Sequence, residues 1–401
     1  MADTLQKNKT GYDMIYLAAC ALHGRLPETE RLHTMNLADV YQMAKFHAMQ
    51  AVTFMALDSW RNAGSDITEI LSPEVWKKWG EARSRALRKN ILFDAEREKL
   101  FSFLNEKKIW HMPLKGVILQ TYYPVYGMRQ MVDNDILFDP QGRETVQKYF
   151  LENGYEIGQA DDDSHDVYLK PPVYNFEMHF SLYRGSTNQT RYQYYNTVTD
   201  RLISCGKDRP SEYRFSDEDF YIYCTAHAYK HFTGPGIGIR AVMDSYVFLS
   251  EREDSLNWPY IEEECRKLEM QEYEYAVRHL CKKLFGQNSN FAAVPDSLTE
   301  EEQALTAFFI SSGSHGTAEN VLIQKIRSGI QRKDGITASG KLHYFLHRLF
   351  PDTEYLQKHY PFFGKHKILR PFLFIYRAIR ALIRYPKTLY MELKLLWNAK
   401  K

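Results

Sequence analysis

The stretch that decides the fold is MVDNDILF, residues 131–138. Its short apolar pattern is typical of a buried strand. Asp133 and Asp135 are two residues apart, and side chains two apart on a strand share one face of the sheet. Neighbouring carboxylates repel each other unless a cation lies between them, and Mg²⁺ prefers oxygen ligands. The stretch therefore predicts a divalent-metal site, with two solvent-facing acids at a strand end as the alternative.

A second strand is predicted for Val173–Leu182, where apolar and polar residues alternate with a period of two. Glu177 lies on the polar face of this strand. If the two strands are neighbours, Glu177 completes an acidic triad with Asp133 and Asp135. Such a triad can hold two Mg²⁺ or Mn²⁺ ions around a phosphoryl group in transfer.

The surrounding pattern predicts an α+β fold with three parts. Residues 1–100 form a helical N-terminal region, residues 101–205 a small mixed sheet, and residues 206–401 a helical C-terminal domain. Short apolar runs predict strands at 110–114, 132–138, 155–157, 166–169 and 173–182, with a helix at 143–153. Helix starts are expected at Ser72-Pro73, at Ser216 with Asp219, and at Ser297 with Glu300.

Composition favours a globular cytoplasmic protein. Of the 401 residues, 44% are hydrophobic and 25% charged, which is enough apolar material for sizeable cores. No apolar run is long enough to span a membrane, and the first residues do not form a signal peptide. The five cysteines include no C-x-x-C pair, which indicates reduced thiols and no zinc knuckle.

The C-terminal tail is strongly basic. Between Lys365 and Lys401 there are ten Lys or Arg and one Glu, a net charge of +9 in a chain whose total is +2. An apolar stripe lies opposite several arginines in the tail. The stripe comprises Phe372, Ile375, Tyr376, Ile379, Leu382 and Ile383, and the arginines are Arg377, Arg380 and Arg384. Packing on the protein body and binding of an anionic partner, either nucleic acid or a membrane surface, are both open.

Three other patterns carry less weight. His227 and His231 have a spacing that can bind zinc, but Ala228 stands where a zinc protease has Glu, which favours a structural pair. The glycines at 236 and 238 match a dinucleotide fingerprint by letter, but they follow a helix, so a helix–helix turn at Pro235 is expected. The chain contains no P-loop string, and the acidic run at 161–163 is expected to be a solvated loop.

The order of the short motifs resembles the DNA polymerase beta-like nucleotidyltransferase superfamily, in which a glycine turn and a helix precede a D-x-D strand. More narrowly, the chain looks like a bacterial group of uncharacterised nucleotidyltransferases over about residues 90 to 385. The motifs that carry the resemblance are Leu114-Lys115-Gly116, Tyr123-Pro124, Arg129-x-Met131, Asp133-x-Asp135-Ile136-Leu137, Glu177-x-His179, Ser181-Leu182, His227-x-x-Lys230-His231, Gly238-Ile239-Arg240-x-x-x-Asp244, Leu349-Phe350-Pro351 and Tyr360-Pro361.

The resemblance implies a nucleotidyltransferase palm over residues 101–205 and a role for each motif. Asp133, Asp135 and Glu177 would be the catalytic and metal-binding acids, with Mg²⁺ or Mn²⁺ as the cofactor. The residues that would contact the nucleotide are Lys115, Gly116, Arg129, His179, Lys230 and Arg240. Two positions depart from the superfamily pattern: Val117 follows the turn glycine, and Asn134 replaces an apolar residue and needs a polar partner on the other face of the sheet.

The function expected from these observations is the transfer of a nucleoside monophosphate from an NTP, ATP included, to an acceptor hydroxyl. The acceptor is open among a small molecule, a tRNA end and a protein. Two rivals remain at this stage. One is a catalytically degenerate palm that binds a nucleotide or a partner, for which Asn134 is the motivation. The other is an interaction protein that acts through its basic tail.

Overall fold

The computed structural model describes residues 2–160, 164–185, 188–287 and 294–314, and, further on, residues 316–317, 320, 356, 360, 362–363, 366 and 369–384. The chain divides into two compact units. Unit 1 comprises residues 1–230 and 237–314, and unit 2 comprises residues 231–236 and 315–401. The predicted boundaries at residues 100 and 205 lie inside unit 1, and a continuous helix crosses residue 100.

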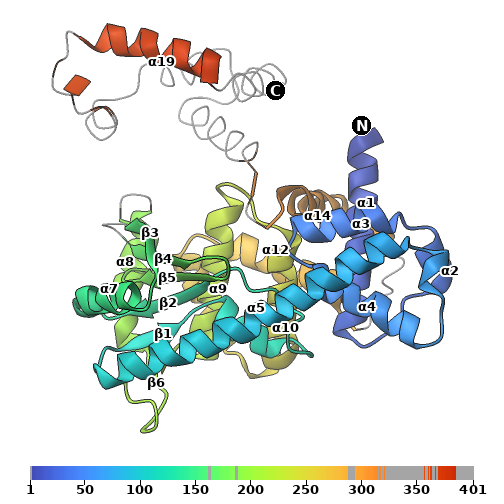
Figure 1. The fold of residues 1–401 in the computed structure, drawn as a ribbon, viewed down its shortest axis with the longest axis horizontal. Coiled ribbons are helices and arrows are strands. Elements are labelled where there is room, and N and C mark those ends of the chain that lie inside the picture. Colours follow the sequence, from blue (N-terminus) through green and yellow to red (C-terminus); the bar gives the residue numbers. More distant parts are fainter. Residues whose placement is uncertain are drawn as a thin grey trace. The chain divides into compact units, whose positions relative to one another are not determined.

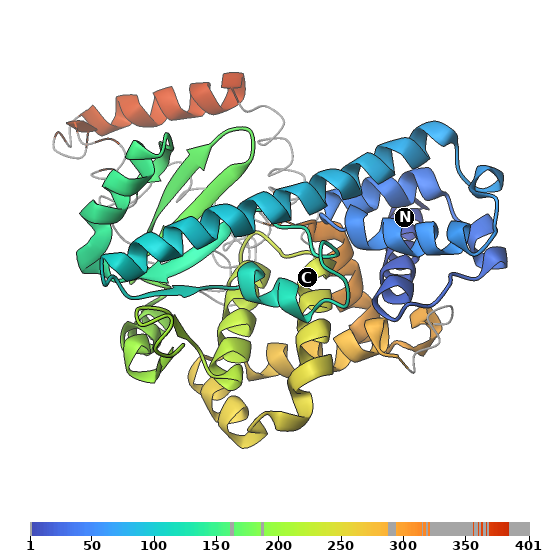
Figure 2. The ribbon, with the colours of Figure 1, turned by 60° about the horizontal axis from the view of Figure 1, so that its bottom comes forward.

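The N-terminal part of unit 1 is helical. Its helices are α1 (Ala2–Leu22), α2 (Thr29–His33), α3 (Leu37–Phe46), α4 (Gln50–Asn62) and α5 (Pro73–Glu106). The predicted start at Ser72 is confirmed, because its side chain accepts a hydrogen bond from the backbone N–H of Val75 and Pro73 takes the first helical position. Figures 1 and 2 both show α5 running from these helices to the sheet.

The sheet has five strands in the order β1-β2-β5-β4-β3. They are β1 (His111–Pro113), β2 (Asn134–Phe138), β3 (Glu156–Ala160), β4 (His165–Lys170) and β5 (Tyr174–His179). Strands β2 and β5 are parallel neighbours, whereas the other neighbouring strands are antiparallel. The predicted mixed sheet in an α+β fold is therefore confirmed, and each predicted strand overlaps an observed one.

One face of the sheet is covered by α5 and by α7 (Arg143–Glu152), the helix predicted at 143–153. Their apolar side chains form one core with inward-facing strand residues. Phe176 and Met178 are fully buried in this core, as the period of two in β5 requires. Because this face is apolar, the alternate residues Asp135, Glu177 and His179 lie on the opposite face.

The rest of unit 1 is mainly helical. The helices after the sheet are α8 (Gln189–Asn196), α9 (Asp217–Phe232), α10 (Ile239–Arg252), α11 (Trp258–Lys267), α12 (Gln271–Phe285), α13 (Val294–Ser297) and α14 (Glu300–Ser312). Short elements are α6 (Gly116–Leu119), η1 (Ile67–Glu69), η2 (Gln120–Tyr122), η3 (Pro140–Gly142), η4 (Val198–Arg201), η5 (Glu253–Ser255), β6 (Ile203–Ser204) and β7 (Tyr213–Arg214). The last two residues of α9 belong to unit 2.

Two of the predicted helix starts have different outcomes. The hydroxyl of Ser216 accepts a hydrogen bond from the backbone N–H of Asp219, as expected at the start of α9. The start predicted at Ser297 is wrong, because that residue ends α13. The capping box of α14 is formed instead by Thr299 and Glu302, which fit the same sequence pattern two residues later.

In unit 2, helix α19 (Arg370–Arg384) contains all the residues of the predicted apolar stripe and of the arginines expected opposite it. Phe372, Ile375 and Tyr376 on this helix are exposed. The side chains of Ile379, Leu382 and Ile383, the basic residues after 384 and the acidic run at 161–163 lie outside the described residues. In the part of the chain that is described, no helix combines the length and the apolar character needed to cross a membrane.

Candidate active site

The parallel pairing of β2 with β5 places Asp135 directly opposite Glu177. The adjacency that the predicted triad required is therefore present. His179 lies two residues beyond Glu177, on the same face of β5, because side chains alternate along a strand. One ligand atom from each of Asp135, Glu177 and His179 lies within 4.8 Å of the others. Two carboxylates and one imidazole thus form a compact cluster, which we call the sheet-face cluster.

The ammonium group of Lys115 lies next to the sheet-face cluster. Its Nζ is 2.8 Å from Oδ1 of Asp135 and 3.2 Å from Nε2 of His227 on α9. Lys115 is two residues after the end of β1 and has φ of +40°, a backbone conformation that is strained for a residue with a side chain. The turn after β1 therefore directs this lysine toward the carboxylates that the sequence predicts to be catalytic.

Burial and charge set the protonation of the cluster. Burial alone would raise the pKa of Asp135, but Lys115 and the hydrogen bond from His179 outweigh it and hold this pKa well below its ordinary value. Burial, together with the charge of Asp135, raises the pKa of Glu177 to about 7. Burial also lowers the pKa of His179, so a neutral imidazole is favoured. Asp135 is therefore the permanent anion of the cluster, and Glu177 can take up or release a proton near neutral pH.

Asp133 is one residue before the start of β2 and is half-buried. Burial and the charge of Asp135 raise its pKa, while Lys115, Arg240 and Arg129 act against this shift. Asp133 therefore lies within electrostatic reach of the cluster, although the compact group of three ligand atoms contains His179 and not Asp133.

The guanidinium of Arg129 lies against the glycine turn and is bound by Asp244. Its Nε and Nη2 donate to the two carboxylate oxygens of Asp244 on α10, at 2.8 and 3.0 Å, and the hydroxyl of Tyr123 donates to the same carboxylate at 2.7 Å. A Cβ atom on Gly116 would be only 2.6 Å from Nη1 of Arg129. The missing side chain of Gly116 thus makes room for this guanidinium, which is a structural reason for glycine at this position.

The two other predicted cationic contacts come from helices α9 and α10. Lys230 lies 5.7 Å from the ring centre of Tyr183, and its pKa is lowered by burial and by the charge of Lys115. Arg240 lies in the first turn of α10 and donates to the carbonyl of Gln130 at 3.2 Å. Burial and the charge of Arg129 lower its pKa. Lys230 therefore lies within electrostatic reach of Glu177, and Arg240 within reach of Asp133.

Asn134 points to the opposite face of the sheet, as the sequence predicted, and has a partner there. Its Oδ1 accepts a hydrogen bond from Nη1 of Arg97 on α5 at 3.0 Å. Among the described residues, its Nδ2 has no hydrogen-bond partner. The departure from an apolar residue is thus accommodated under α5, away from Asp135.

Two residues of the site were not predicted in their observed roles. Asp244 is four residues after Arg240, a spacing that also allows an ion pair along one helix, but its carboxylate binds Arg129, 115 residues away in sequence. The sequence predicts a structural pair of His227 with His231, and the structure adds a contact between Nε2 of His227 and Nζ of Lys115. Neither contact has a local signal, because each joins elements that are distant in sequence. The position of His179 could have been inferred, since it shares a strand face with Glu177.

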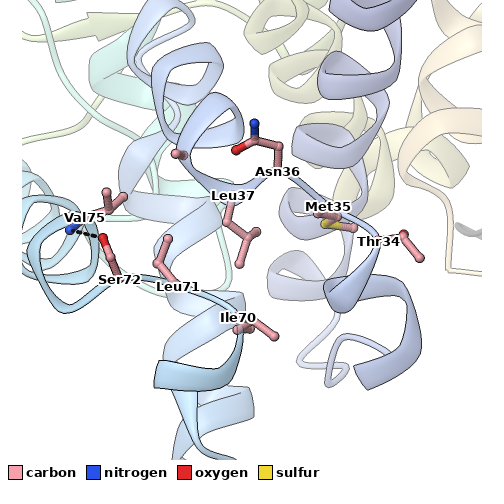
Figure 3. Close-up of a pocket in the computed structure, with 9 residues that line it drawn as sticks. Thr34, Met35, Asn36, Leu37, Ile70, Leu71, Ser72 and Val75 are labelled. Carbon is pink, nitrogen blue, oxygen red and sulfur yellow. Dashed lines mark hydrogen bonds between the residues drawn. The ribbon is translucent and has the colours of Figure 1, made fainter.

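A hollow of about 520 Å³ lies elsewhere in unit 1, where α3 and α5 begin. Figure 3 shows that its lining comes from the segment around Asn36 and from the segment around Ser72, whose hydroxyl accepts from Val75. Its lining contains no charged side chain. We therefore assign the chemistry of the protein to the sheet-face cluster and not to this hollow.

The fold and the site together define an α+β protein that carries paired carboxylates on the face of a small mixed sheet opposite α5 and α7. A family model described as uncharacterised nucleotidyltransferase matches residues 33–286. The chain belongs to this uncharacterised nucleotidyltransferase family. Membership supports nucleotidyl transfer as its general activity and an NTP as its substrate. No curated protein and no solved structure matches the chain.

Proposed function

We propose that the protein is a metal-dependent nucleotidyltransferase of the DNA polymerase beta-like superfamily. It moves a nucleoside monophosphate from an NTP to an acceptor hydroxyl and releases pyrophosphate. The observation that carries the proposal is the register of β2 and β5, which sets Asp135 opposite Glu177 on the face not covered by α5 and α7. Carboxylates paired in this way, with cations around them, suit the binding of a metal-bound polyphosphate.

The residues present fit a divalent cation. Asp133, Asp135 and Glu177 are the carboxylates that would hold it, and the ammonium of Lys115 already lies at 2.8 Å from one of them. Mg²⁺ or Mn²⁺ would stabilise the negative charge that develops on the phosphate oxygens. The chain itself supplies the oxygen ligands and the buried surroundings that strengthen such electrostatic interactions.

Four cationic side chains would contact the triphosphate. Lys115 contacts Asp135, Lys230 lies within electrostatic reach of Glu177, and Arg240 lies within reach of Asp133. The N–H groups of Arg129 that are not used by Asp244 or Met131 face the glycine turn. Gly116 would allow a close approach of the backbone to phosphate. These contacts would orient the nucleotide and offset its charge.

The reaction then requires one proton transfer and one exchange of bonds at phosphorus. The acceptor oxygen forms a bond to the α-phosphorus while the bond from that phosphorus to the bridging oxygen of pyrophosphate breaks. The proton of the acceptor hydroxyl passes to a carboxylate oxygen of Glu177, which lies beside Asp135 on the same face. The acceptor class is open among small molecules, tRNA and protein, and the use of ATP and the cytoplasmic location stay predictions.

The test is transfer of label from each α-labelled NTP, with Mg²⁺ or Mn²⁺, into a lysate of the source cells. Wild-type protein is compared with Asp133→Ala/Asp135→Ala and with Asp139→Asn, a matched control at the far end of β2 whose side chain caps a short helix. We expect transfer by wild type and by the control but not by the double variant. The acceptor class follows from which fraction carries the label.

Two outcomes would overturn the proposal. One is the absence of metal-dependent transfer by wild type with all four nucleotides. The other is equal transfer by the double variant, which would show that the carboxylates of β2 are not required.

A further inference from the structure

The imidazole of His179, for which the resemblance implied only a contact with the nucleotide, lies close to two carboxylates. Its Nε2 lies 3.0 Å from Oδ1 of Asp135 and 3.7 Å from Oε2 of Glu177. The side chain is largely buried, and Glu177 and His179 alternate on the same strand, so the backbone of β5 fixes both on one face. The imidazole therefore directs one nitrogen between two carboxylates, which is the arrangement of a ligand set and not only of a nucleotide contact.

A second observation shows that this position attracts a cation. The ammonium of Lys115 lies 2.8 Å from Asp135, and burial of both side chains makes the unpaired carboxylate costly. In this structure the ammonium of Lys115 thus lies against the carboxylate of Asp135, where a bound cation would also lie.

We infer that His179 is a metal ligand, and that Asp135, Glu177 and His179 form a mixed oxygen and nitrogen site that prefers a first-row transition ion to Mg²⁺. Mg²⁺ requires oxygen ligands in near-octahedral geometry, whereas an imidazole nitrogen favours transition ions. The inference rests on the proposed metal-dependent function and narrows it to a cation class. It also gives His179 a role different from the direct nucleotide contact that the resemblance implied.

His165 provides a matched control. It lies on β4 directly opposite His179, with the two ring centres 4.9 Å apart. Its Nδ1, however, is 3.0 Å from the hydroxyl of Ser164, and it is not part of the compact ligand group. Replacement of His165 therefore removes a neighbouring imidazole without removing a proposed ligand.

The experiment uses Mn²⁺ alone as the probe, with the full chain and no nucleotide. Electron paramagnetic resonance counts free and bound Mn²⁺, and pulsed measurements on the bound ion detect coupling to a nitrogen nucleus. Mg²⁺ is then titrated as a competitor. Wild type, His179→Gln and His165→Gln are compared, and circular dichroism confirms that each variant is folded.

We expect nitrogen coupling in wild type and in His165→Gln, and its loss in His179→Gln. Loss of a ligand should weaken Mn²⁺ binding by at least about 10–100-fold, the range found when only a hydrogen-bond partner of a metal ligand is removed. Affinity for Mg²⁺ should change less, so the preference for Mn²⁺ over Mg²⁺ narrows.

Bound Mn²⁺ without nitrogen coupling in wild type would overturn the inference, and so would a Mn²⁺ preference unchanged in a folded His179→Gln. This result is separate from the fate of the proposed function. Nitrogen coupling without nucleotidyl transfer would support the metal site and contradict the proposed enzyme function. Metal-dependent transfer without nitrogen coupling would support the enzyme function and contradict His179 as a ligand.

Discussion

The buried contact between Asp244 and Arg129 gives the most direct test of how the site is supported. Asp244 accepts three hydrogen bonds, two from Arg129 at 2.8 and 3.0 Å and one from Tyr123 at 2.7 Å. The two charged side chains are only 9% and 11% exposed. In Asp244→Asn the side chain keeps its shape, but its charge is lost and one acceptor oxygen becomes a donor that faces another donor.

The expected loss of stability follows from the unpaired guanidinium. Removal of one partner from a buried ion pair costs about 3–5 kcal/mol, because the other charge stays buried without compensation. Urea unfolding followed by tryptophan fluorescence measures this loss. With a slope of about 3 kcal/mol per molar urea, the upper end of the range for small proteins, the midpoint should fall by about 1–2 M. The double variant Arg129→Met/Asp244→Leu removes both charges and should recover a large part of the stability.

The matched control is the same substitution at an exposed ion pair. Asp58 pairs with Arg61 at 2.9 Å, but their side chains are 27% and 41% exposed. Asp58→Asn should therefore change the free energy of unfolding by less than about 1 kcal/mol. If Asp244→Asn is no more destabilising than Asp58→Asn, then Arg129 does not depend on Asp244 and the proposed support of the glycine turn is refuted.

Two further predictions concern the turn and the titration of the cluster. Gly116→Ala places a methyl group 2.6 Å from Nη1 of Arg129. This overpacking should lower the free energy of unfolding by about 1–3 kcal/mol, measured by thermal unfolding. Unchanged stability would contradict the assigned contact. Burial and Asp135 raise the pKa of Glu177 from 4.5 to about 7, so between these values the native state binds more protons than the unfolded state and stability falls as pH rises. In metal-free wild type, urea midpoints should report a fall in the free energy of unfolding of at most about 3 kcal/mol between pH 5 and 7.5. This fall should be absent in metal-free Glu177→Gln, and identical pH profiles of the two proteins would contradict the shift.

The strands that carry the site were predictable because their signals are local. The alternation of apolar and polar residues in Val173–Leu182 specifies which face of β5 is buried, and the buried Phe176 and Met178 agree with it. The hairpin of β6 and β7 was not predicted, because two residues per strand are too few to show a period.

The contacts that shape the site were beyond local pattern. Lys115 and Asp135 are 20 residues apart, and Arg129 and Asp244 are 115 apart. Their pairing depends on how β1, the glycine turn and α10 pack together, which periodicity does not encode. Charge alone was consistent with Arg129 as a phosphate ligand, and only the packed structure shows that two of its nitrogens are already bound to a carboxylate.

Asn134 was the one feature of the sequence that favoured a degenerate site, and the structure gives it a different meaning. Side chains alternate on β2, so Asn134 faces α5 while Asp135 faces the cluster. Its amide oxygen binds Arg97, which also donates to Asp94 at 2.6 Å, and this polar network joins the strand to the long helix. A polar residue anchored on the covered face does not disturb the carboxylates on the other face. Because it also links β2 to α5, Asn134 supports the strand that holds Asp135, and the argument for a degenerate palm loses its only motivation.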